Sequence, residues 1–116
     1  MSRIQAQQDA QLTRAVLPLL TLTLLAEEES YGYQLVERLA ELGLEVTTGL
    51  MYPLLSRLER DGLVDTRMVP STSGPPRKYF AVTEAGHATR ASMKDQWQVV
   101  ATAVQAAVEK EHAPHA

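Results

Sequence analysis

The stretch that decides the fold is SYGYQLVERLAELGLEVTTGLMYPLLSRLERDGLV, residues 30–64. In its first part, Leu35, Leu39 and Leu42 recur at helical spacing and form one apolar stripe. Ser30 is a suitable N-cap before this stripe, and Gly43 is a typical terminator after it. This part therefore predicts a helix between Ser30 and Gly43.

The second part of the stretch predicts another helix, which Thr47 caps and Asp61-Gly62 ends. Its inward positions are Leu50, Leu54, Leu55 and Leu58. Pro53 is tolerable because it lies near the start, where backbone N–H groups have few partners within the helix. The short link GLEV between the two helices is typical of a helix-turn-helix.

After Gly62 the apolar period changes to two, which predicts a hairpin with strands 63–69 and 77–83 around a loop 70–76. A long helix from Glu84 to Glu111, capped by Thr83, follows the hairpin, and a helix beginning near Leu12 precedes the quoted stretch. The predicted fold is mainly α with a small β-hairpin. It is a winged helix-turn-helix (residues 1–83) followed by a C-terminal dimerisation helix and tail (residues 84–116).

The hairpin carries SGPPRKYF, residues 73–80, in an acidic chain of net charge −3. A hairpin tip beside a reading helix is placed to touch the DNA backbone, so Arg77 and Lys78 are candidate phosphate ligands. The alternative is a solvated edge whose cations only discourage strand pairing. Charge is uneven along the chain: residues 47–80 hold five basic and three acidic side chains, which favours a local basic face.

Several classes of protein are disfavoured. The chain has no cysteine, no signal-peptide pattern at its start, and an apolar run (residues 19–26) too short to cross a membrane, which favours a cytoplasmic protein. No motif places a general base or a phosphate-binding glycine loop, so we expect no enzyme and no cofactor. His112 and His115 form only a weak metal signal in the tail, and we expect no metal site.

Residues of the last helix repeat at spacings of four and three, as in a heptad seam. A helix of this length cannot bury that face on a small body, so we expect a second copy of the chain to cover it. The alternative is a stripe that packs only within its own subunit. The predicted dimer interface combines this seam with the first helix and consists of Leu12, Val16, Met93, Trp97, Val100, Val104, Ala107 and Val108.

The YGY before the second helix, the pattern G-x-x-Y-P-L-L-x-R-L-E-x-x-G-L in the third, and the G-P-P-R-K-Y wing together resemble the PadR family of bacterial transcriptional regulators. The resemblance covers about residues 19–86, and the short tail is similar to compact family members with a single C-terminal helix. It implies a homodimeric winged helix-turn-helix repressor that is relieved by a small molecule or a stress signal. Because a twofold dimer reads two half-sites, we expect the operator on double-stranded DNA to be an inverted repeat. Met51 is a departure from the family pattern, because members commonly carry threonine or leucine at the position before the tyrosine, which is Tyr52 here.

Recognition helices present their N-terminal residues to the major groove, which makes the exposed start of the third helix the candidate reading surface. Tyr31 or Tyr33 could hold a phosphate beside the free N–H groups of the second helix. Arg57 either binds a phosphate or pairs with Glu59 or Asp61. The candidate DNA-binding residues are Tyr31, Tyr33, Thr47, Thr48, Gly49, Tyr52, Arg57, Arg77 and Lys78.

Trp97 is the only tryptophan and lies on the predicted seam. Compact members of the resembled family include some that hold flat aromatic compounds between paired tryptophans, which implies a planar hydrophobic effector near Trp97, Met93 and Val100. The alternative is a tryptophan that only fills the interface. For the whole chain, the alternative function is a winged helix that contacts other proteins and has no operator of its own.

Overall fold

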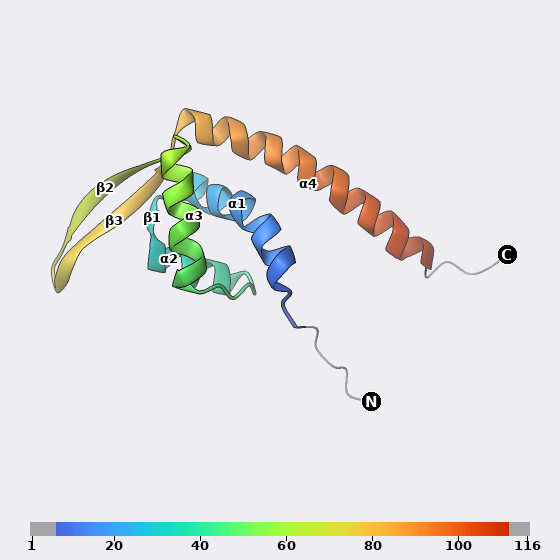
Figure 1. Cartoon of the computed structure of the whole chain (residues 1–116), viewed down its shortest axis with the longest axis horizontal. Helices are drawn as coiled ribbons and strands as arrows, with labels where there is room; N and C mark the ends of the chain where they lie inside the picture. Colours follow the sequence, from blue (N-terminus) through green and yellow to red (C-terminus); the bar gives the residue numbers. More distant parts are fainter. Residues whose placement is uncertain (1–6, 112–116) are drawn as a thin grey trace.

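The structure is a computed structural model that describes residues 7–111. Within this range the elements follow the order helix, short strand, two helices, two strands and a long helix (Figure 1). Their bounds are α1 Ala10–Glu27, β1 Ser30–Tyr31, α2 Gly32–Glu41, α3 Thr48–Arg60, β2 Val64–Ser71, β3 Gly74–Val82 and α4 Glu84–Glu111. The predicted winged helix-turn-helix with a long C-terminal helix is confirmed.

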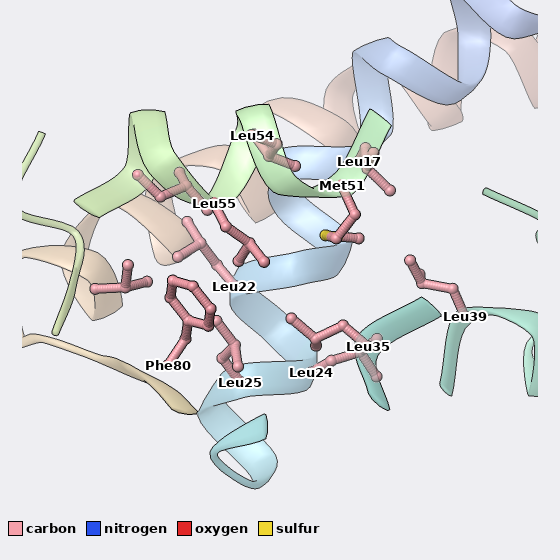
Figure 2. Packing of buried hydrophobic residues seen from close by; sticks show 12 residues of the cluster. Leu17, Leu22, Leu24, Leu25, Leu35, Leu39, Met51, Leu54, Leu55 and Phe80 are labelled. Carbon is pink, nitrogen blue, oxygen red and sulfur yellow. The ribbon is translucent and has the colours of Figure 1, made fainter. Parts of the chain in front are cut away.

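One apolar core holds the winged-helix body together. It joins leucines of α1, α2 and α3 with Met51 of α3 and Phe80 of β3, as Figure 2 shows. Leu22, Leu35 and Leu55 are fully buried at its centre, one from each helix. Burying such side chains is worth about 1.5–3 kcal/mol each, so this cluster fixes α3 relative to the wing.

The sheet has three strands in the order β1-β3-β2, one more than the predicted hairpin. β1 pairs with β3 through Ser30 opposite Phe80 and Tyr31 opposite Tyr79. The sequence did not indicate this strand because two residues are too few for an alternating pattern. Its consequence is that the start of α2 is attached to the edge of the wing.

The predicted loop 70–76 is wrong, because the strands run on to Ser71 and resume at Gly74. The pairing is irregular between Val69 and Ser71, where Pro70 lies opposite Pro75 and Pro76. Prolines cannot donate to a sheet ladder, and a bulge accommodates them. The wing is therefore a longer arm than the pattern predicted, and in Figure 1 it projects away from the C-terminal end of α4.

Two predicted details of α2 are also wrong. Ser30 is not the N-cap, which is Tyr31 without a side-chain bond; the Ser30 hydroxyl instead accepts a bond from Arg38 Nη1 at 2.9 Å. Leu42 is 62% exposed rather than part of the inward stripe, because α2 ends at Glu41 and the chain turns at Gly43 with φ +90°.

The start of α4 is fastened to the wing. The Gly86 N–H donates to Thr83 Oγ1 at 3.0 Å, which confirms the predicted cap, and the Thr83 N–H donates to the Leu63 carbonyl at 3.1 Å. A Cβ on Gly86 would lie far inside contact distance of that same carbonyl oxygen and 2.8 Å from Val82 Cγ1. Gly86 is the only buried α4 residue among those the structure describes, so most of this helix lies outside the core.

Candidate nucleic-acid interface

The reading helix α3 buries one face in the core, and the N-terminal end of its other face is exposed to solvent. Thr47 caps it as predicted, with its side-chain oxygen 3.2 Å from the Leu50 N–H. Met51 faces the core, is fully buried, and lies 4.0 Å from the Thr21 hydroxyl through its sulfur. Thr47, Thr48 and Gly49 are exposed, so the backbone at the start of α3 is open to a ligand.

Tyr52 extends from α3 onto the start of α2. A Cβ on Gly32 would meet the Tyr52 ring at 2.5 Å from Cε1 and 2.9 Å from the hydroxyl, so the ring lies directly against this glycine. Gly32 therefore permits a contact between the two helix starts that any larger residue would displace. Tyr52 remains 47% exposed and Tyr33 56% exposed, which leaves both rings accessible.

The wing separates the two adjacent cations. Side chains alternate between the faces of a strand, so Arg77 and Lys78 of β3 point to opposite faces. The Arg77 guanidinium lies 4.5 Å from the centroid of the Tyr31 ring, and Tyr31 contacts Tyr79 edge to face at 5.3 Å. This stack orders Arg77 beside the start of α2.

Two other wing cations are paired with carboxylates. Lys78 Nζ donates to Glu59 of α3 at 3.1 Å, and Arg67 pairs with Glu29. The Lys78 bond holds the pKa of Glu59 below its usual value, with a smaller contribution from Thr66, and the Arg67 bond does the same for the pKa of Glu29. Both carboxylates are therefore charged at neutral pH.

Arg57 makes no ion pair among residues 7–111, so the alternative pairing with Glu59 or Asp61 is not observed. It lines a hollow of about 180 Å³ between α1 and α3, opposite Arg14 and beside Leu50 and Pro53. Arg57 thus lies on the α1 side of the reading helix, away from the wing.

A second hollow, of about 270 Å³, lies between the wing and α3. It brings together four of the predicted residues with Ser56, a non-core position of α3 that was not a candidate because the prediction favoured residues nearer the start of the helix. The lining residues are Tyr31, Gly32, Tyr52, Ser56, Pro76, Arg77, Lys78 and Phe80. The other candidates, Tyr33, Thr47, Thr48, Gly49 and Arg57, do not line it.

The predicted dimer and effector residues gather elsewhere, between α1 and α4. A hollow of about 380 Å³ is lined by Leu12, Ala15, Val16, Pro18, Leu19, Met93, Gln96, Trp97 and Val100. No ionisable side chain lines it. Beyond it, Val104 (55% exposed) and Val108 (44% exposed) continue the apolar stripe, and Ala107 is exposed as well. Met93, nearer the start of α4, is half-buried and packs against the core, so only the later part of the stripe is uncovered within the protomer.

Across residues 7–111, no helix is long and apolar enough to span a membrane. The same residues contain no cluster of three or more His, Asp or Glu side chains that could hold a metal ion. His112 and His115 lie outside the described residues.

These features define a winged helix-turn-helix protein of the DNA-binding class. They are a reading helix with an exposed N-terminal end, a wing that bears cations, and a hollow between the two. Residues 21–92 match the transcriptional regulator PadR-like family, and the chain belongs to that family. It is thus a DNA-binding transcriptional regulator and not an enzyme.

Relatives agree with this assignment. The chain is 38% identical over 65 residues to the transcriptional regulator Rv3488 of Mycobacterium tuberculosis, a match that spans 54% of this chain and 58% of that relative's length. A PadR family transcriptional regulator from Eggerthella lenta is 35% identical with a TM-score of 0.77, covering 85% of this chain and 87% of that one. A PadR-like transcriptional regulator from Bacillus cereus is 33% identical with a TM-score of 0.77, covering 85% and 97%.

Proposed function

We propose that this chain is a sequence-specific transcriptional regulator that binds an inverted-repeat operator as a homodimer. Two observations carry the proposal: Tyr52, Arg77 and Lys78 line the hollow between the wing and α3, and the start of the reading helix is exposed. A groove with aromatic and cationic walls fits a phosphate backbone, while the helix start fits the edges of bases.

The contacts divide by chemistry. Thr47, Thr48, Gly49 and Tyr52 lie at the start of α3, and we assign them to the major groove. Tyr31, Tyr33 and Arg77 lie at or near the start of α2, where unpaired N–H groups favour a phosphate. Lys78 and Arg57 flank α3 on its two sides and are further candidate phosphate ligands. Such a regulator acts in the cytoplasm, where bacterial DNA is.

Dimerisation through α4 and α1 accounts for the exposed stripe. Trp97, Val100, Val104 and Val108 are each at least 44% exposed in the protomer. A row of large apolar side chains along one helix is costly in water and favours a symmetric partner. The division into a DNA-binding unit (residues 1–83) and a dimerisation unit (residues 84–116) follows from this assignment.

Repression relieved by a planar hydrophobic effector is the finer part of the proposal. The hollow between α1 and α4 has apolar walls, includes Met93, Trp97 and Val100, and adjoins the proposed dimer seam. A flat compound bound there would change the distance between the two reading helices of the dimer and so lower operator affinity. Calorimetry with a panel of planar compounds tests this: Trp97→Ala should lose binding and remain a dimer, whereas equal affinity in the variant would leave Trp97 as a structural residue.

The experiment for the main proposal is binding to duplex DNA from upstream of the protein's own gene, compared with a random duplex, over a range of salt concentrations. The proposal expects tighter binding to the upstream DNA and a linear fall of log affinity with log salt. Equal, salt-insensitive or undetectable binding to both duplexes would instead favour a winged helix that contacts proteins.

A further inference from the structure

One carboxylate of the reading helix contacts both long strands of the wing. Glu59 lies one residue from the end of α3. Its Oε2 accepts a bond from the Thr66 hydroxyl of β2 at 3.1 Å, and its Oε1 accepts a bond from Lys78 Nζ of β3 at 3.1 Å. Glu59 therefore links the wing to the helix that reads DNA.

The same contact distinguishes the two adjacent cations of the wing. Lys78 is paired with Glu59 and also lies 5.6 Å from the centroid of the Phe80 ring. Arg77 points to the other face, lies over Tyr31, and has no carboxylate partner among residues 7–111. Lys78 is thus compensated within the protein, whereas the charge of Arg77 is not.

This difference matters for DNA because a phosphate that approaches Lys78 also approaches the Glu59 carboxylate. The pair is about half exposed, so solvent screens it but does not abolish the repulsion. A wing with both cations uncompensated would bind any duplex more tightly, since phosphate contacts carry no sequence information.

We propose that Glu59 is a specificity-determining positioning residue: it holds Lys78 and the wing against α3 and withholds that cation from sequence-independent phosphate binding. The inference rests on the proposed DNA-binding function and revises one of its assignments: it removes Lys78 from the candidate phosphate ligands and leaves Arg77 as the principal phosphate ligand of the wing.

The test is Glu59→Gln, which removes the charge and keeps the shape. Released Lys78 should gain a phosphate contact, so affinity for a random duplex rises and the salt slope steepens by about 0.9. Between about 50 and 200 mM salt, that slope makes the variant lose about 3.5-fold more affinity than the parent. Affinity for the upstream duplex should rise less, so the ratio of specific to random binding falls.

Asp61→Asn is the matched control. Asp61 is exposed two residues further along and forms no ion pair within the described range, so its removal changes the net charge equally without releasing Lys78. The control should leave the salt slope unchanged. An equal steepening in both variants would show that net charge alone acts, and would overturn the role of Glu59.

Lys78→Gln completes the comparison and keeps the inference testable even if Glu59→Gln folds poorly. Alone it should change the parent's salt slope little, whereas Arg77→Gln should flatten it by about 0.9. In the Lys78→Gln background, Glu59→Gln should no longer steepen the slope. Two results would refute the inference and leave the proposed function standing. One is that Lys78→Gln alone flattens the salt slope by about 0.9, as loss of a full phosphate contact would. The other is that the parent binds DNA and Glu59→Gln does not change its salt slope. A parent that binds no duplex refutes both.

Discussion

Gly86→Ala should destabilise the protein although it places a better helix former inside a helix. In an exposed helix this change stabilises by up to about 1 kcal/mol. At Gly86, however, the new methyl would collide with the Leu63 carbonyl oxygen and approach Val82 Cγ1 to 2.8 Å. The first of these is backbone, so the collision cannot be relieved by a rotamer change.

The magnitude follows from the contacts. Overpacking a well-filled site costs about 1–3 kcal/mol. Moving the Leu63 carbonyl also strains its 3.1 Å bond from the Thr83 N–H, and such a bond contributes about 1 kcal/mol. After subtracting the gain in helix propensity, we expect a net loss of about 2 kcal/mol, which lowers the melting midpoint by roughly 8 °C.

Gly49→Ala is the matched control, because Gly49 is also a helical glycine. The nearest atom to a Cβ there is Thr47 Oγ1, at 3.7 Å, which is ordinary contact. Urea or thermal unfolding at one fixed protein concentration should show Gly86→Ala destabilised and Gly49→Ala unchanged or slightly stabilised. Equal stability of Gly86→Ala and the parent would refute the close packing of α4 on the wing.

Four further predictions follow from the same contacts. Val104→Glu should give a monomer by light scattering, since it places a charge in the proposed seam; a dimer would contradict that seam. Arg77→Ala should flatten the salt slope of DNA binding by about 0.9, measured by fluorescence anisotropy. Gly49→Ala should fold normally but weaken operator binding, because its methyl obstructs close approach to the helix start. The lowered pKa values of Glu29 and Glu59 mean that their ion pairs stabilise the fold above the ordinary glutamate pKa, about 4.3, and lose this effect as pH falls through the lowered values. Glu29→Gln should therefore melt below the parent at pH 7, and the difference should disappear under strongly acidic conditions.

Periodicity was enough to predict the helices and the wing. The leucines of α2 and α3 repeat at helical spacing, and the alternation after Gly62 indicated strands, so the order of the helices and of the two long strands could be read from residue types alone. The caps at Thr47 and Thr83 were predictable because a threonine before an apolar stripe satisfies free N–H groups.

Features that depend on distant partners could not be predicted. Ser30 has the chemistry of a cap, but pairing of its backbone with Phe80 places it in a strand. The prolines of the wing are typical of a loop in the sequence, and only the structure shows the irregular pairing that accommodates them within the strands.

The same limit applies to the candidate site. Arg77 and Lys78 are adjacent in sequence and equivalent in charge, yet only the fold puts Lys78 on Glu59 and Arg77 on Tyr31. A count of basic residues therefore predicts the basic face but not which of its cations are compensated.

The most direct test of the central claim is selection of binding sites from a pool of random duplexes, with the mass of the resulting complex measured. The account predicts that an inverted repeat is enriched, with half-sites about one helical turn apart or a small multiple of it, and that two chains bind each duplex. An unenriched pool, or a single chain on each duplex, would contradict it.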